Sequence, residues 1–231
     1  MIKKLVLLLY LCCSFSGTVP TVTDDDKATL ALMREEEKLA RDVYLTLNEK
    51  WDQVVFQHIS GAEITHMKLV KTMMDKYGVD DPVARTKDKR GKFVNQQFQD
   101  LYKSLTSSGL TSMEQAFRVG AYVEEWDLKD LYRAEKATKS EDLQVLYGQL
   151  IRASEQHLRA FTRNLQRAGQ TYEPVILPKD TYELIISTGG PGGGMGQGRG
   201  QGMGPGAKAT ANGEACPPEC PHRKAGCFQE Q

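Results

Sequence analysis

The sequence predicts an all-α protein built on a four-helix bundle, and two observations support this fold class. Four segments carry apolar residues at the spacing of one helix face, which is typical of helices that pack around a shared core. Near the middle of each apolar stripe, acidic or histidine residues interrupt the pattern. A carboxylate in an apolar interior is costly unless it is paired or binds a cation, so these interruptions indicate a metal site inside the bundle.

The first two helices are predicted from their ends and their stripes. The first starts after Thr23 with three acidic residues, which suit a helix N-terminus, and runs to about Lys50. Its stripe contains Leu30, Met33, Glu37, Ala40, Tyr44 and Leu47. The second runs from about Val54 to Tyr77, where Gly78 can adopt the left-handed terminating conformation. Its stripe contains Phe56, Ile59, Glu63, His66, Val70, Met73 and Tyr77.

The last two bundle helices follow a long connection. Thr111 and Glu114 have the spacing of a capping box for the third helix, and Ser140 can cap the fourth, which is expected to end at Gly169. The third stripe contains Met113, Phe117, Gly120, Glu124, Asp127 and Leu131. The fourth contains Leu143, Tyr147, Leu150, Ser154, His157, Phe161 and Leu165.

Two further segments complete the predicted helical domain, residues 24–187. The connection from Gly78 to Thr111 is one long crossover, with a basic stretch at 87–92 and a short extra helix near Asn95–Leu105. After Gly169, an extended segment ends in a short helix at about 180–186.

Aligning the four interruptions collects one candidate ligand layer. It consists of Glu37, Glu63, His66, Glu124, Asp127 and His157. Four carboxylates and two imidazoles can hold two divalent cations, and this donor set suits iron or manganese; a structural zinc would be expected to show cysteines, which the helices lack. The alternative is a buried polar network that has lost its metal, for which Ser154 in the fourth stripe is the best argument.

The ligand pattern resembles that of the ferritin-like di-iron carboxylate proteins, which place one Glu on each of two helices and Glu-x-x-His on each of the other two. Glu63 and His66 match one such motif, and Glu37 with Tyr44 seven residues later looks like the first-helix pattern of ferritins and rubrerythrins. The fourth helix departs from it, because Ser154 stands where a Glu is expected. We infer that Asp127 on the third helix supplies the missing carboxylate.

Longer runs carry a second, narrower resemblance. Residues 35–44, 120–127 and 154–161 look like the prokaryotic family named domain of unknown function 2202, within the same superfamily, and the likeness covers roughly residues 27–187. The resemblance implies a ferritin-like four-helix bundle and a metal, but it brings no activity.

Several residues of the helices have alternative interpretations. Glu125 competes with Glu124 for the inward position, which the heptad phase assigns to Glu124. Tyr44 and Tyr147 lie on the inner stripes, either as simple core residues or as phenols that hydrogen-bond a ligand or take part in redox chemistry. The pairs 35–36 and 41–42 are expected on a solvated helix face.

The two ends of the chain are predicted to lie outside the bundle. Residues 1–16 read as a signal peptide, so the protein is expected to be exported to the periplasm, cell surface or medium; lipid attachment at Cys12 or Cys13 is the alternative and the only predicted link to a membrane. Residues 188–214 form a Gly-rich flexible linker. In the tail, 215–231, an additional metal could bind Cys216, Cys220, His222 and Cys227, or two of these cysteines could form a disulfide.

Charge and ligand chemistry together limit the function. Lys plus Arg and Asp plus Glu balance at 30 each, so there is no electrostatic case for nucleic acid. The expected partners are metal ions and small oxidants, and assembly into homo-oligomers stays open. We predict an exported redox protein with two iron (or manganese) ions that acts on oxygen, peroxide or ferrous iron. The alternative is a non-catalytic metal-binding or helical interaction module. The pattern assigns ligands but no catalytic residue.

Overall fold

The computed structural model describes residues 22–188, and this part of the chain contains helices and no strand. The helices are α1 (Asp24–Trp51), α2 (Val54–Tyr77), α3 (Pro82–Arg85), α4 (Gln96–Gly109), α5 (Met113–Ala137), α6 (Glu141–Arg167) and α7 (Lys179–Ser187). The prediction of an all-α bundle is therefore confirmed. The signal peptide, the Gly-rich linker beyond Thr188 and the cysteine-containing tail lie outside the described residues and stay predictions.

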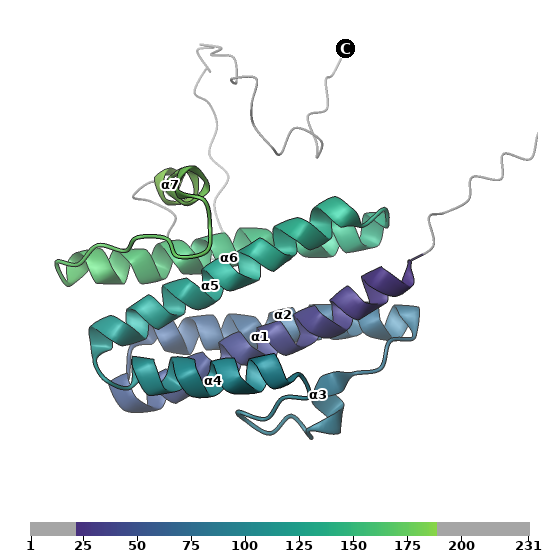
Figure 1. Ribbon diagram of the computed structural model, residues 1–231, viewed down its shortest axis with the longest axis horizontal. Helices are drawn as coiled ribbons and strands as arrows, with labels where there is room; N and C mark the ends of the chain where they lie inside the picture. The colour runs from purple at the N-terminus through teal and green to yellow at the C-terminus, as the bar shows by residue number, and fades with distance from the viewer. Residues whose placement is uncertain (1–21, 189–231) are drawn as a thin grey trace, which may run out of the picture. The chain divides into compact units, whose positions relative to one another are not determined.

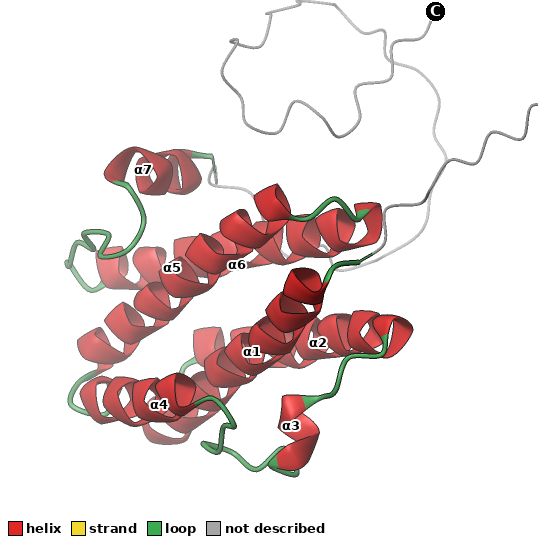
Figure 2. Cartoon of the chain, turned by 45° about the vertical axis from the view of Figure 1, so that its right-hand side comes forward, coloured by secondary structure: helices red, strands yellow, loops and turns green. Residues whose placement is uncertain are grey.

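Four long helices form the bundle as two hairpins (Figure 1). The first hairpin pairs α1 with α2 across a two-residue link, and the second pairs α5 with α6. The hairpins meet where α1 contacts α5 and α2 contacts α6. The crossover between them carries α3 and α4, and α4 lies along both α1 and α5, as the turned view also shows (Figure 2). α7 packs on α6.

The ends of α1, α2 and α5 follow local capping chemistry, whereas Ser140 occupies the N-cap position of α6 without a side-chain capping hydrogen bond. Thr23 and Asp26 form a capping box at the start of α1, and Gly78 ends α2 with a φ of 65°. The predicted capping box at Thr111 is wrong. Ser112 is the N-cap of α5 and accepts a hydrogen bond from the Gln115 amide at 3.1 Å, because the Thr111 hydroxyl instead donates to the Ser108 carbonyl at the end of α4.

The apolar stripes meet in a continuous core, which includes an aromatic cluster at one end of the ligand layer. The rings of Tyr44, Phe56 and Phe161 lie 5.2–6.2 Å apart, centroid to centroid, and all three side chains are buried. Gly120 is required beside them, since a Cβ at this position would lie 2.5 Å from the Phe161 ring. The stripe of the third helix begins less deeply than predicted, because Met113 is 41% exposed.

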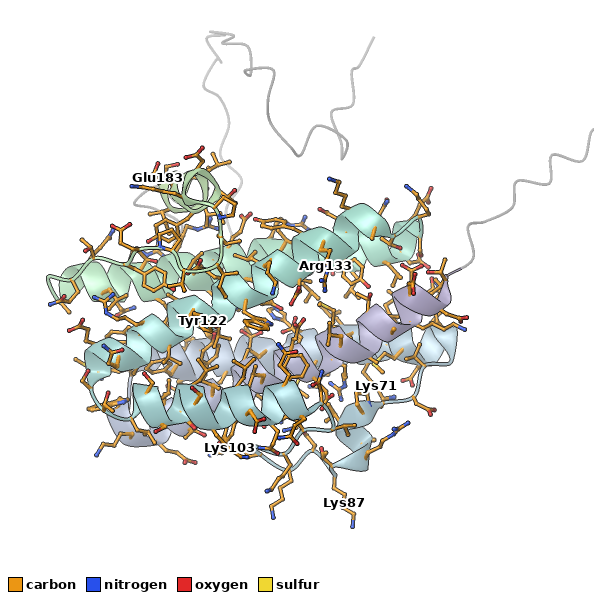
Figure 3. All side chains as sticks on the ribbon, in the orientation of Figure 1. Lys71, Lys87, Lys103, Tyr122, Arg133 and Glu183 are labelled. Carbon is orange, nitrogen blue, oxygen red and sulfur yellow. The ribbon has the colours of Figure 1, made fainter. Side chains whose placement is uncertain are left out.

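The crossover covers a face of α1 that the sequence analysis assigned to solvent, so that assignment is wrong. Asp42 is fully buried and accepts hydrogen bonds from Arg41 and from the Gly91 amide, both at 2.9 Å. Arg41 in turn donates to Asp88 at 2.6 Å. By contrast, the side chain of Lys87 in the same connection points away from the helices (Figure 3).

Glu35 is buried on the same face for the same reason. Its carboxylate accepts hydrogen bonds from the Val94 amide at 2.6 Å and the Asn95 amide at 3.1 Å, just before α4. The carboxylate therefore satisfies backbone donors of the crossover, and this pairing offsets the cost of burying its charge.

Candidate metal centre

The structure brings five of the six predicted ligand residues into two overlapping groups at mid-bundle. One group joins Glu37 of α1 with Glu63 and His66 of α2, and the other joins Glu63 with Glu124 of α5 and His157 of α6. Within each group, the donor atoms lie within 4.8 Å of one another. Each group therefore offers two carboxylates and one imidazole to a cation.

Glu63 belongs to both groups, and its two oxygens face different imidazoles. Oε2 lies 2.6 Å from Nδ1 of His66, whereas Oε1 lies 3.0 Å from Nδ1 of His157. The outer carboxylates complete the arrangement. Glu37 Oε2 lies 3.3 Å from the His66 nitrogen, and Glu124 Oε2 lies 3.5 Å from the His157 nitrogen. The Glu63 carboxylate thus lies between the two imidazoles, and each imidazole has a second carboxylate beside it.

Several possible metal-ligand atoms of this layer are buried without a hydrogen-bond partner within residues 22–188. Their free lone pairs show whether the layer could bind cations. Glu37 Oε1, Glu63 Oε1 and His157 Nδ1 are in this state. The Glu63 and His157 atoms are 3.0 Å apart, yet their directions do not meet hydrogen-bond geometry. Two ligands at right angles around an ion with bonds of about 2.1 Å would also lie about 3.0 Å apart. Since buried polar atoms are rarely left unpaired, the donor set fits cation binding.

Burial and the close approach of the carboxylates and imidazoles shift the pKa values of the layer. Burial raises the pKa of Glu37 to about 8, although His66 opposes this. Burial would lower the pKa values of both imidazoles, but the surrounding carboxylates outweigh it and raise them to about 11 for His66 and about 10 for His157. The raised pKa values favour protonated imidazoles between the carboxylates when no cation is bound. Divalent cations in the same place would displace these protons.

Tyr44 and Glu124 form a hydrogen bond that orients one outer carboxylate. The fully buried phenol donates to Glu124 Oε1 at 2.5 Å. This bond fixes the position and orientation of the Glu124 carboxylate, so Tyr44 does more than fill the core. Tyr147, the other phenol on an inner stripe, is also fully buried, but its hydroxyl has no hydrogen-bond partner within residues 22–188.

Glu124 and Glu125 face different parts of the molecule. Glu124 faces the ligand layer, as the heptad phase predicted. Glu125 is fully buried elsewhere and accepts hydrogen bonds from the Tyr172 hydroxyl at 2.5 Å and from the Ile176 and Leu177 amides at 2.8 and 2.7 Å. It therefore ties the extended segment before α7 to α5.

Asp127 lies beside the layer but in neither group. It is 7% exposed, and its Oδ2 accepts a hydrogen bond from the Ser154 hydroxyl at 2.6 Å, while its Oδ1 has no partner. From the sequence, Ser154 is interpreted as a missing Glu or as part of a buried polar network, and its bond to Asp127 is not predicted. That Asp127 binds a cation of the centre stays a prediction.

Solvent reaches the layer almost only at the imidazoles. The side chains of His66 and His157 retain 10% and 11% of their surface, whereas those of Glu37, Glu63 and Glu124 retain 2–3%. Such a narrow opening suits ions and small molecules better than large substrates.

Fold and site together define a class: a four-helix bundle with carboxylate and histidine groups at its centre that could hold metal ions. The chain belongs to the family described as "Uncharacterized protein domain (DUF2202)", whose model matches residues 26–189. It is 43% identical over 167 residues to "Uncharacterized protein MJ0754" of Methanocaldococcus jannaschii, covering 72% of this chain and 89% of the relative. The crystal structure titled "hypothetical protein MJ0754 from Methanococcus jannaschii DSM 2661" superposes with a TM-score of 0.71 at 43% identity, covering 73% of this chain and 95% of that one. Among the described helices, none is long and apolar enough to cross a membrane.

Proposed function

We propose that the chain is a ferritin-like protein with a two-cation redox centre, in which Glu37, Glu63, His66, Glu124 and His157 hold two iron or manganese ions. The observation that carries this proposal is the shared Glu63 carboxylate, with one oxygen directed to each imidazole. Residues 22–188 contain no cysteine, and carboxylates with imidazoles favour iron or manganese.

The substrates that we propose are dioxygen, peroxide or ferrous iron. Bound iron or manganese would supply one-electron steps, taking electrons from ferrous iron or giving them to dioxygen or peroxide. The chain itself contributes three carboxylates that compensate the cation charge, a phenol that orients Glu124, and a layer shielded from bulk water except at the imidazole edges. Access for only small molecules agrees with this substrate class.

The protein is further proposed to act outside the cytoplasm, as an exported and, in the alternative, lipid-anchored protein. This part of the proposal rests on the N-terminal segment 1–16, with its two lysines followed by an apolar run. Edman sequencing of protein recovered from the periplasm or medium would test it, and an intact Met1 on cytoplasmic protein would contradict it.

A non-catalytic metal-binding module is the second candidate, and the low exposure of the carboxylates favours it. The two candidate functions differ in how the protein behaves once it holds iron. Full-length protein loaded anaerobically with two equivalents of ferrous iron is mixed with dioxygen or peroxide, and near-ultraviolet absorbance is followed. The redox proposal predicts oxidation at least about tenfold faster than with Glu63→Gln, the variant that lacks the shared carboxylate. Exposed Glu49→Gln serves as the control and should react like wild type. Iron that binds but oxidises no faster than with Glu63→Gln would leave the binding module as the function.

A further inference from the structure

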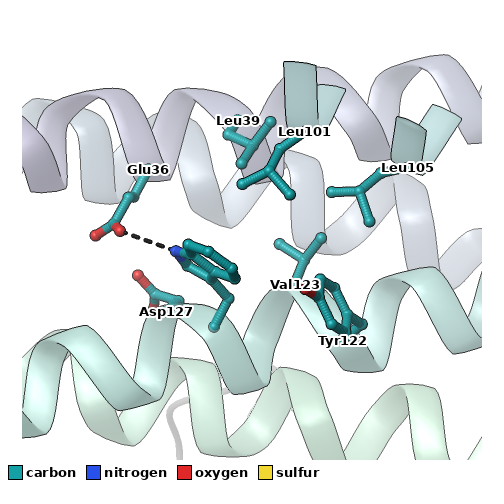
Figure 4. A pocket seen from close by; sticks show the side chains of 8 residues that line it. Glu36, Leu39, Leu101, Leu105, Tyr122, Val123 and Asp127 are labelled. Carbon is teal, nitrogen blue, oxygen red and sulfur yellow. Dashed lines mark hydrogen bonds between the residues drawn. The ribbon is translucent and has the colours of Figure 1, made fainter. Parts of the chain in front are cut away.

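A groove lies where the extended segment 170–178 and α7 meet α6, and side chains from all three line it. Its volume is about 320 Å³, which is in the range of pockets that take small organic ligands. A second cavity, under α4, has a volume of only about 10 Å³ and mainly apolar walls (Figure 4). Of these two spaces, only the groove has room for an organic molecule.

Two tyrosine rings form the buried part of the groove. Tyr172 and Tyr182 are 7% and 8% exposed, and their ring centroids lie 6.0 Å apart. The Tyr172 hydroxyl donates to the Glu125 carboxylate at 2.5 Å, which fixes this ring. Arg159 of α6 donates to the Ile185 carbonyl at 3.0 Å, which ties α7 to α6. Contacts outside the groove therefore hold its walls in place before any ligand binds.

The hydroxyl groups of the groove donate their protons to other parts of the protein. Thr162 donates to the Leu158 carbonyl and Ser187 to the Leu184 carbonyl, both at 2.9 Å, and the Tyr172 proton goes to the buried carboxylate named above. A hydroxyl whose proton is already donated can offer a ligand only its lone pairs. The groove is therefore rich in acceptors, and a matching ligand must bring hydrogen-bond donors.

The charge of the groove is negative. Glu173 of the extended segment and Glu183 of α7 line it, and within residues 22–188 no basic side chain does so. Lys179 lies 3.8 Å from Glu183, but these two side chains keep 68% and 60% of their surface, so the pair is weak. Two carboxylates favour a cation. The tyrosine rings favour an organic one, because aromatic faces attract ammonium groups and pack against alkyl chains.

We propose that the groove binds an aliphatic diamine in its doubly protonated form. Its ammonium groups would pair with Glu173 and Glu183 and donate to the hydroxyl oxygens, while its alkyl chain would lie against Tyr172 and Tyr182. Two carboxylates on two different elements suit a ligand with two positive charges. This inference goes beyond the proposed function, because the groove shares no residue with the metal centre and the proposal involves no reaction.

A chemical-shift titration of ¹⁵N-labelled, metal-free full-length protein with butane-1,4-diamine at pH 7 tests the proposal. Saturable shifts are expected at the amides of residues 171–173 and 182–187. Butane-1,4-diol has the same chain length without the charges, and it should cause no saturable shift at these amides. Saturable shifts only elsewhere, no saturable shift at all, or equal binding of the diol would each overturn the proposal.

Variants of the groove test which side chains hold the ligand. Glu173→Gln and Glu183→Gln should each weaken diamine binding about 1.5–5-fold, as expected for exposed ion pairs. Tyr182→Leu should weaken it about 2–5-fold by removing one aromatic face. Glu49→Gln removes an exposed carboxylate from α1 and is the matched control, which should bind like wild type. Circular dichroism melting checks folding, and the exposed Glu173 carries the test if Tyr182→Leu does not fold. Wild-type affinity in both glutamate variants would overturn the proposal.

Two further measurements separate the alternatives. Nα-acetyl-lysine methylamide, which carries one ammonium group, should bind more weakly than the diamine. Equal or tighter binding would overturn the diamine assignment and indicate that the groove takes a lysine side chain of a partner protein. Glu63→Gln, which alters the metal centre, should bind the diamine like wild type. A failure of the metal centre therefore leaves the groove intact, and the two proposals can fail separately.

Discussion

Tyr44→Phe should lower the thermal stability of the protein, whereas Tyr147→Phe should not. The reason is that only the Tyr44 hydroxyl has a hydrogen-bond partner. Tyr44 and Tyr147 lie on the inner stripes of α1 and α6, and both are fully buried. The Tyr44 hydroxyl donates to Glu124 at 2.5 Å, whereas the Tyr147 hydroxyl makes no hydrogen bond. The two substitutions remove the same atom from similarly buried rings, so they isolate the value of the bond to Glu124.

The size of the difference follows from the partner. Hydrogen bonds to a charged group contribute about 1.5–3 kcal/mol, and Tyr44→Phe also leaves a buried carboxylate oxygen without its donor. For a domain of this size, 1 kcal/mol corresponds to about 2–4 °C in Tm, so Tyr44→Phe should lower Tm by about 3–12 °C. Removing an unpaired buried hydroxyl has a near-neutral or stabilising effect, so Tyr147→Phe should not lower Tm.

Thermal unfolding of the full-length chain in chelator, followed by circular dichroism at pH 8, measures both effects. Urea unfolding supplies the free energies and checks that the m-value is unchanged. Equal losses for the two variants, or a larger loss for Tyr147→Phe, would refute the assignment of Tyr44 as the donor that holds Glu124. In metal-loaded protein, Tyr44→Phe should also weaken cation binding about 10–100-fold, since Tyr44 orients a ligand.

Three further predictions concern protons, the extended segment and the tail. Metal affinity should rise with pH from 6 to 8, because the pKa values of His66 and His157, about 11 and 10, keep both imidazoles protonated until a cation displaces the protons. Calorimetry in buffers of different ionisation enthalpy should show that binding releases at least about two protons. A metal affinity that does not change with pH would contradict this prediction. Glu125→Gln should destabilise the chain by roughly 3 kcal/mol, since it loses charge-assisted hydrogen bonds to several donors. The same substitution should speed proteolysis within residues 170–178, and an unchanged cleavage rate would show that other contacts hold this segment. A chain that ends at Thr188 should melt within a few degrees of full length and keep its core metals, whereas an unfolded or metal-free product would mean that the tail docks on the helices.

The helices and the clustering of acidic and histidine side chains at mid-bundle could be predicted from the sequence because the relevant signals are local. The 3.6-residue period identifies the inner face of each helix, and Val54 and Gly78 mark the limits of α2. The same period selects Glu124 over Glu125, and the structure agrees. Burial of Glu125 itself could not be foreseen, because its partners come from a segment about fifty residues further along the chain.

The crossover explains what the sequence could not predict. Glu36 reads as a solvated residue because helical period alone cannot show that a distant helix covers the outer face of α1. Once α4 covers that face, Glu36 becomes a buried carboxylate with a free oxygen. The role of Ser154 was hidden for a similar reason, since its partner Asp127 lies on another helix.

Anomalous diffraction from crystals grown with Mn²⁺ would show whether the Glu63 carboxylate joins two cations in the core. Data collected on either side of the manganese edge should show two peaks in the bundle, about 3.5–4 Å apart, one beside Glu37 and His66 and the other beside Glu124 and His157. Both peaks should contact the Glu63 carboxylate, and crystals of Glu63→Gln should lack them. Wild-type crystals with no anomalous peak in this layer, or with peaks that do not contact Glu63, would rule out a Glu63-bridged pair of cations.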